Sequence, residues 1–158
     1  MSEMTEIVSK IAAKMLAIST TVATAESCTG GNIAHQITLV PGSSAWVRGG
    51  VVSYTNEVKM NILGVPSELI ESYTEVSNQV AEAMAEGARN VTGADFAVST
   101  TGIAGPTGAT ATDPVGTVYI GVATPFKVVS QRMVFGTDRE QNIERFTAAA
   151  LEMLLANV

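Results

Sequence analysis

The sequence is poor in the residues on which several common kinds of protein depend. Its single cysteine allows no internal disulfide and no zinc site built from cysteines. Its single histidine, His35, is expected at the surface or between helices, so a Ser–His–Asp triad is excluded. Aromatic residues make up only 5% of a chain that is 46% hydrophobic. The core must therefore consist of Val, Ile, Ala, Met and Leu, which is typical of helices packed closely on a sheet.

Long apolar runs and clusters of positive charge are also missing. No run approaches the roughly 20 apolar residues that span a bilayer, and the N-terminus carries acids where a signal peptide carries bases. We therefore expect a cytoplasmic protein with no membrane partner. Nine Lys and Arg against fifteen Asp and Glu give a formal net charge of −6. Because a nucleic-acid groove needs clustered positive charge, no nucleic-acid partner is expected, whereas a small phosphorylated ligand needs only a few donors.

Helix and strand patterns alternate over the first two thirds of the chain. Apolar residues at helical spacing and short β-branched runs predict these elements. The predicted helices cover 3–18, 32–40, 55–62, 67–72, 77–91 and 138–156, and the predicted strands cover 20–25, 47–54, 96–100, 115–124 and 127–135. The last two strands form a hairpin. The expected architecture is one α/β domain over residues 1–158, a three-layer α/β/α sandwich whose mostly parallel sheet has an antiparallel hairpin extension.

Three loops follow predicted strands, and ligands collect at the carboxyl ends of strands in such sheets. They cover 26–31, 54–59 and 101–114. The first, Glu26-Ser27-Cys28-Thr29-Gly30-Gly31, leads into a helix whose free N–H groups can hold a phosphate or stabilise an oxyanion. An ordinary capped turn explains this loop equally well. No lysine follows its glycines, so a P-loop for a nucleoside triphosphate is not expected.

Ser27 and Cys28 are the candidate nucleophiles. A cysteine nucleophile needs a group that depresses its pKa, and because no histidine is suitably placed we expect Cys28 to be a packing residue. A serine can instead use a lysine of lowered pKa. Lys59 lies in the first turns of a predicted helix, where the helix N-terminus and burial both disfavour its ammonium form. The Tyr54 hydroxyl could pass or position the proton, although both residues also fit plain structural roles.

The third loop and the start of the last helix suggest binding groups. Thr101-Gly102-Ile103-Ala104-Gly105-Pro106-Thr107-Gly108 contains no acid or base, and its glycines are typical of a backbone cradle around a ligand. Arg139 is a candidate phosphate clamp or, alternatively, a surface arginine. The acidic residues are scattered, so no metal site is expected.

Together these segments resemble the C-terminal domain of the competence/damage-inducible protein CinA, over nearly the whole chain. Five motifs in the family's order carry the resemblance: Thr24-Ala25-Glu26-Ser27-Cys28-Thr29-Gly30-Gly31, Pro41-Gly42-Ser43-Ser44-Ala45-Trp46, Ser53-Tyr54-Thr55-Asn56-Glu57-Val58-Lys59, Thr101-Gly102-Ile103-Ala104-Gly105-Pro106 and Pro114-Val115-Gly116-Thr117-Val118. Stand-alone members of that family are nicotinamide mononucleotide amidohydrolases. The resemblance therefore implies hydrolysis of nicotinamide mononucleotide to nicotinate mononucleotide and ammonia, in pyridine-nucleotide salvage, without cofactor or metal.

The resemblance also implies roles for individual residues. Ser27 is expected to be the nucleophile, activated by Lys59 and Tyr54. The expected substrate-binding residues are Thr29, Gly30, Gly31, Asn56, Gly102, Ile103, Ala104, Gly105 and Arg139.

Two departures from the family pattern concern the phosphate end of the expected pocket. Asp113 stands where the family usually has Lys, and Ile143 where it often has Arg. Deamidation of a related amide and a non-catalytic regulatory or ligand-binding module of the same fold are therefore the alternatives. DNA binding rests only on the competence label, and the charge argues against it. Helices rich in Ala and Met also favour a homodimer or larger assembly.

Overall fold

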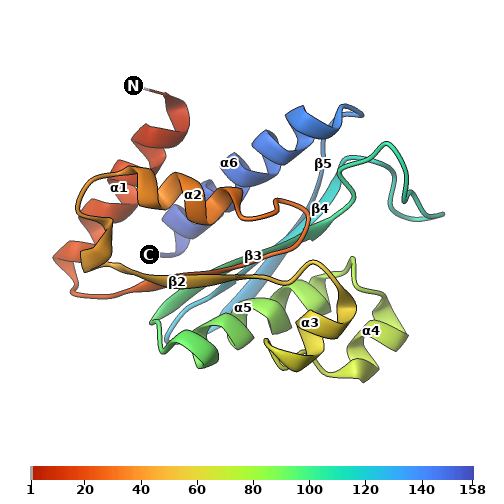
Figure 1. Cartoon of the computed structure of the whole chain (residues 1–158), viewed down its shortest axis with the longest axis horizontal. Helices are drawn as coiled ribbons and strands as arrows, with labels where there is room; N and C mark the ends of the chain where they lie inside the picture. Colours follow the sequence, from red (N-terminus) through yellow and green to blue (C-terminus); the bar gives the residue numbers. More distant parts are fainter. Residues whose placement is uncertain (1) are drawn as a thin grey trace.

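The structure, a computed structural model, describes residues 2–158 and places helices on both faces of one sheet (Figure 1). One face carries α1 (Glu3–Ala17), α2 (Asn32–Leu39) and α6 (Arg139–Asn157). The other carries α3 (Asn56–Asn61), α4 (Ser67–Tyr73) and α5 (Asn78–Thr92), while a 3-10 turn, η1 (Ser43–Ala45), follows α2. The predicted three-layer α/β/α arrangement is confirmed. No helix in the described part of the chain is long and apolar enough to cross a membrane.

The sheet has five strands in the order β2-β1-β3-β4-β5. β1 (Val22–Glu26) pairs in parallel with β2 (Val47–Val52) on one side and β3 (Phe96–Gly102) on the other. β4 (Thr117–Ala123) runs antiparallel to β3, and β5 (Val128–Val134) runs antiparallel to β4. The prediction of parallel strands extended by an antiparallel hairpin is confirmed. Two of the strand pairings are parallel and two are antiparallel.

Side chains at the helix starts explain where several helices begin. Thr55, Ser77 and Asp138 each accept a backbone N–H from the first turn of the helix that follows, which satisfies a donor that has no partner within the helix. Three of the predicted helices, 55–62, 77–91 and 138–156, start at these residues, and each start is confirmed to within one residue. These caps fix the entry points of α3, α5 and α6.

Two cores, mostly aliphatic, lie one on each face of the sheet. The larger packs α1, α2 and α6 over the strands, with Ile11, Met15, Phe146 and Leu151 fully buried. The smaller packs α5 and the residues around α4 against small side chains of β1 and β3. Because those strand residues are alanines, α5 lies close to the sheet. This matches the aromatic-poor core expected from composition.

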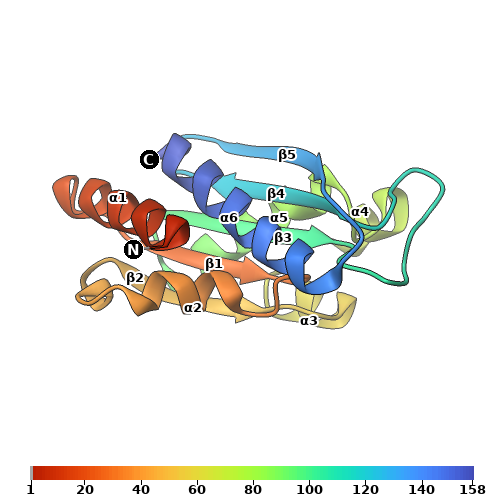
Figure 2. The same ribbon diagram turned by 90° about the horizontal axis from the view of Figure 1, so that it is seen from above.

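The three parallel strands end at the same edge of the sheet (Figure 2). Glu26, the last residue of β1, is in register with Val52 of β2 and Thr100 of β3. Residues just beyond these positions therefore meet at one level. All three strand ends differ from prediction by one or two residues, because β1 ends at Glu26 rather than at residue 25, β2 at Val52 rather than at residue 54, and β3 at Gly102 rather than at residue 100.

Candidate active site

Ser27 and Lys59 meet at this edge of the sheet. The Lys59 Nζ lies 3.0 Å from the Ser27 Oγ, and the two residues are only 1% and 8% exposed. Ser27 directly follows β1, and its N–H donates to the Thr100 carbonyl of β3 at 3.1 Å, which fixes its height above the sheet. Lys59 extends from α3, the helix that Thr55 caps. Two segments more than thirty positions apart thus bring a hydroxyl and an amine into contact.

Burial of Lys59 disfavours its charged ammonium form. Its Nζ donates to the Ser53 carbonyl at 2.8 Å and lies 3.4 Å from the Tyr54 carbonyl. A neutral amine has two N–H groups and one lone pair, so the two carbonyls can take both N–H groups and leave the lone pair for the Ser27 hydroxyl. Burial lowers the pKa of Lys59 from its ordinary value, and the nearby negative charge of Glu75 opposes this only in part. The pair is therefore arranged as a hydroxyl and its base.

Cys28 is a poor nucleophile in this setting. Its side chain is buried, and burial raises the pKa of its thiol to about 12. Because the reactive form of a cysteine is the thiolate, Cys28 stays inert at neutral pH. The geometry agrees with the expectation that Cys28 is a small packing residue.

The Glu26 side chain caps the N-terminus of α2, a role that was not predicted from the sequence. The Glu26 carboxylate is 1% exposed and accepts the N–H groups of Ile33 at 2.8 Å and Ala34 at 3.0 Å. The N-cap residue, Gly31, has no side chain to offer. These N–H groups are therefore engaged and are not free for a phosphate. A glycine at an N-cap was the available signal that an acceptor must come from elsewhere.

The structure does not bring Thr29, Gly30 and Gly31 to the cavity that Ser27 lines. The Thr29 hydroxyl is buried, donates to the Glu26 carboxylate at 2.6 Å and contacts the Thr100 hydroxyl at 2.9 Å. Gly30 and Gly31 have φ values of 61° and 103°, which the turn into α2 requires and which side chains disfavour. These contacts and backbone angles shape the turn that presents Ser27.

A cavity of about 440 Å³ opens over Ser27 and Lys59, within the usual size range of small-molecule sites. Six of the residues predicted to bind substrate line it, namely Asn56, Gly102, Ile103, Ala104, Gly105 and Arg139. Glu75, Val76, Thr107 and Gly108 line it as well. Within residues 2–158, no group of three or more His, Cys, Asp or Glu side chains is placed to hold a metal ion.

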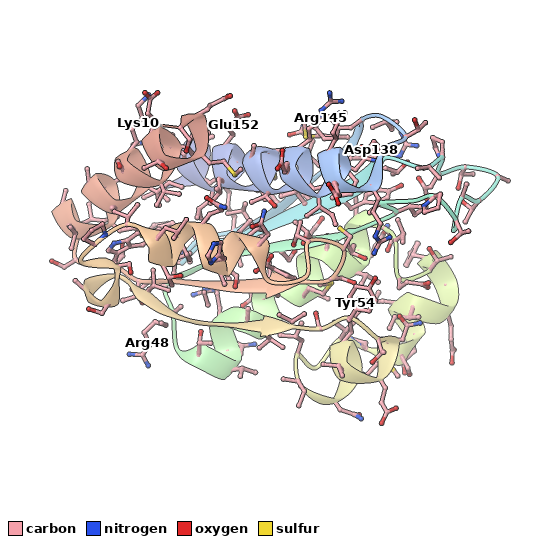
Figure 3. The ribbon with its side chains drawn as sticks, turned by 45° about the horizontal axis from the view of Figure 1, so that its top comes forward. Lys10, Arg48, Tyr54, Asp138, Arg145 and Glu152 are labelled. Carbon is pink, nitrogen blue, oxygen red and sulfur yellow. The ribbon has the colours of Figure 1, made fainter. Side chains whose placement is uncertain are left out.

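Tyr54 and Arg139 meet at the wall of this cavity. Arg139 donates from Nη1 to the Gly105 carbonyl at 2.6 Å and from Nη2 to the Tyr54 hydroxyl at 3.2 Å. Tyr54 comes from the segment that leads into α3 (Figure 3). Its side chain is 57% exposed. Among the described residues, no hydrogen bond joins its hydroxyl to Ser27 or Lys59. Tyr54 contacts Lys59 through its main-chain carbonyl instead. Its hydroxyl therefore makes no contact through which it could pass a proton between Ser27 and Lys59.

The two departures from the family pattern lie outside the cavity wall. Asp113 is buried and accepts hydrogen bonds from the Tyr119 hydroxyl at 2.8 Å and from Arg132 Nε at 3.1 Å. This ties the end of the long loop to β4 and β5. Ile143 packs against the larger core. Neither residue lines the cavity.

Residues 4–158 match the family model of the CinA C-terminal domain. The chain belongs to the CinA C-terminal domain family. The nicotinamide-nucleotide amidohydrolase PncC of Pseudomonas putida is 43% identical over 155 residues, covering 98% of this chain and 97% of that protein. A CinA-like protein of Chloroherpeton thalassium is 50% identical over 137 residues, covering 84% of this chain but 33% of its own length. The chain thus spans about a third of the first longer CinA relatives it matches.

Solved structures of the family share the fold. The competence/damage inducible protein CihA from Agrobacterium tumefaciens superposes with a TM-score of 0.95 at 40% identity, covering 99% of this chain and 96% of that one. A CinA superfamily protein from Escherichia coli gives a TM-score of 0.95 at 30% identity, covering 100% and 94%. The layered fold is therefore that of the CinA C-terminal domain.

Proposed function

We propose that this chain hydrolyses the carboxamide of nicotinamide mononucleotide, giving nicotinate mononucleotide and ammonia. The observation that carries the proposal is the 3.0 Å approach of Lys59 Nζ to Ser27 Oγ beneath a cavity of ligand size. Similarity over almost the full length of a Pseudomonas putida protein named nicotinamide-nucleotide amidohydrolase supports the choice of substrate.

In the first half-reaction, Ser27 is the nucleophile and Lys59 the base. The Ser27 Oγ attacks the carboxamide carbon while its proton passes to the neutral Lys59 amine. The tetrahedral intermediate then collapses, the C–N bond breaks, and Lys59 returns the proton to the departing nitrogen, which leaves as ammonia. The substrate's acyl group remains on Ser27 as an ester.

In the second half-reaction, water replaces the serine. Lys59 takes a proton from the water as its oxygen attacks the ester carbon. The bond to Ser27 Oγ breaks, and Lys59 returns the proton to that oxygen. Nicotinate mononucleotide leaves, and Ser27 and Lys59 are restored to their starting forms.

We assign stabilisation of the negative oxygen in both intermediates to the backbone N–H of Cys28. This N–H directly follows the nucleophile in the chain, a position from which serine hydrolases commonly stabilise an oxyanion. In residues 2–158 it donates to no protein oxygen, whereas the neighbouring Ser27 N–H is occupied by Thr100. The N–H groups of α2, closed by Glu26, do not take part.

We assign the phosphate of the substrate to Arg139. Its guanidinium belongs to the cavity wall and is held by the Gly105 carbonyl and the Tyr54 hydroxyl. Guanidinium groups bind phosphate through paired N–H donors, and this one is oriented before any ligand arrives. Tyr54 accordingly orients Arg139 rather than transferring a proton.

Ammonia release from nicotinamide mononucleotide by the purified protein tests the proposal. We expect Ser27→Ala and Lys59→Met to lose turnover by about a thousandfold or more, because each removes half of the reacting pair. Lys10→Met, which removes an exposed lysine from α1, is the matched control and keeps full turnover. Binding of the nucleotide by the intact protein without ammonia release would instead favour the non-catalytic ligand-binding module.

A further inference from the structure

Glu75 lines the same cavity as Ser27 and Lys59, although its position in the sequence suggested no role. It lies in the short segment 74–77, between α4 and α5. Neither ion pair among residues 2–158 includes it, and no side-chain hydrogen bond there engages its carboxylate. Its negative charge is near enough to act on Lys59, since it raises the pKa of that amine against the effect of burial. Glu75 is therefore an unpaired anion at a ligand-sized cavity.

The backbone that carries Glu75 is strained and firmly held. Thr74 has φ 68° and ψ 165°, a region that is almost restricted to glycine. Three hydrogen bonds fix the segment: the Thr101 hydroxyl donates to the Glu75 carbonyl at 2.7 Å, the Ser77 hydroxyl to the Thr74 carbonyl at 2.9 Å, and the Thr74 hydroxyl to the Val76 carbonyl at 3.2 Å. Such strain persists only where the surroundings over-determine it, and it collects at ligand sites. The segment therefore holds the backbone of Glu75 in place before a ligand binds, while the carboxylate itself is exposed.

The cavity wall consequently carries two opposite charges. Glu75 supplies a negative charge near Lys59, and Arg139 supplies a positive charge beside Gly105 and Tyr54. Lys59 adds no charge in the neutral form that the proposed reaction requires. A ligand that fits this pattern has a positive charge close to the group that reacts with Ser27 and a negative charge further away.

We infer that Glu75 is the specificity-determining residue that selects a carboxamide on a positively charged ring over the same carboxamide on a neutral ring. This inference rests on the proposed function only in placing the carboxamide at Ser27. The ring of nicotinamide mononucleotide is a pyridinium cation, whereas the ring of its reduced form is neutral and carries the same carboxamide, ribose and phosphate. The two ligands therefore differ chiefly in the charge that Glu75 would recognise.

Calorimetric binding of both ligands tests the inference. Measurements use the Ser27→Ala protein, so that neither ligand is consumed, and the same protein with Glu75→Gln added. We expect Glu75→Gln to weaken binding of the oxidised nucleotide roughly tenfold while changing binding of the reduced nucleotide less than about twofold. Glu75→Asp, which keeps the charge, retains most of the preference. Glu71→Gln removes an exposed carboxylate of α4 outside the cavity and changes neither affinity.

Each other outcome has a definite meaning. Equal weakening of both ligands by Glu75→Gln, an unchanged preference, or no preference before the substitution overturns the inference. Failure of the proposed function appears separately, as absence of ammonia release by the intact protein, because the binding measurement needs no turnover. A charge preference that depends on Glu75 in a protein without turnover leaves the inference standing and removes the proposed reaction.

Discussion

The buried carboxylate of Glu26 accepts the N–H of Ile33 at 2.8 Å and so closes the N-terminus of α2. The same carboxylate also takes the Thr29 hydroxyl and the Ala34 N–H. In many α/β proteins a helix N-terminus in this position binds a ligand phosphate. Here an internal carboxylate occupies it, so the turn around Ser27 is stabilised from within and these N–H groups are not available to a ligand phosphate.

Glu26 therefore contributes to stability. We expect Glu26→Ala to lower the free energy of unfolding by about 2–4 kcal/mol, because it leaves several buried donors without an acceptor. Glu26→Gln, which keeps one acceptor oxygen, costs about half as much. Urea denaturation measures both, with the exposed first-turn residue Glu3 of α1 as the control: Glu3→Ala changes stability by less than about 0.5 kcal/mol. Equal effects of Glu26→Ala and Glu3→Ala would contradict this role.

Close packing of α5 on β4 depends on Gly121. A Cβ at Gly121 would meet the Ala81 carbonyl of α5 and lie 2.6 Å from the Ser99 Oγ. We expect Gly121→Ala to destabilise the protein by about 1–3 kcal/mol, since the helix must move away from the sheet. Gly136→Ala is the matched control, because the nearest atom to its Cβ would be 3.5 Å away. Thermal unfolding of the two variants compares them directly, and equal melting temperatures would show that α5 does not lie this close.

Arg139 should distinguish phosphorylated from unphosphorylated substrate. We expect Arg139→Gln to raise KM for nicotinamide mononucleotide at least about tenfold, because a charge-assisted hydrogen bond to phosphate is lost. Reaction of nicotinamide riboside, which has no phosphate, changes little. Arg145→Gln removes an exposed arginine further along α6 and leaves both substrates unaffected (Figure 3). A similar loss with both substrates would mean that Arg139 serves the structure of the cavity rather than the phosphate.

The pH profile should report the protonation of Lys59. Burial lowers the pKa of this amine, and only its neutral form accepts a proton, so kcat/KM is low below the folded-state pKa and rises as pH increases through it. Glu75 opposes the effect of burial, while Arg139 is the other charged group of the cavity wall. We therefore expect Glu75→Gln to move the rising limb to lower pH, because the charge that favoured the ammonium form is gone.

The exposed Glu71 provides the control for this shift. Glu71→Gln changes the net charge of the protein by the same amount, but Glu71 lies on α4 outside the cavity. We therefore expect the rising limb of its pH profile to coincide with that of the unmodified protein. A limb that stays fixed in Glu75→Gln, or that moves to higher pH, would contradict the assignment of the profile to Lys59.

Local signals predicted most of the fold. Polar residues at the helix starts, Thr55, Ser77 and Asp138, and the aliphatic periodicities placed every α-helix and strand to within a few residues, because these signals act over one or two turns. The short 3-10 turn η1 was not predicted. The end of β3 was missed, since its pairing as far as Gly102 depends on β4, which follows in the chain. Long-range pairing leaves no mark in the local sequence.

The site was predicted only in part, because several of its contacts are also long-range. Ser27 and Lys59 stand beside recognisable strand ends, and their motifs resemble a known family. Glu26 and Glu75 were not predicted, because their roles arise from contacts with α2 and with Thr101 that no local pattern encodes. The Tyr54 hydroxyl was expected near Lys59, but its ring turns to Arg139, a partner 85 positions away.

Trapping the acyl-enzyme tests the central claim most directly. The protein is mixed with nicotinamide mononucleotide, quenched in acid within milliseconds, digested and analysed by mass spectrometry. The account predicts that the peptide containing Ser27 carries the acyl group of the substrate, and that the adduct and ammonia release both disappear in Ser27→Ala. Ammonia release that continues in Ser27→Ala, with no adduct on the intact protein, would contradict it.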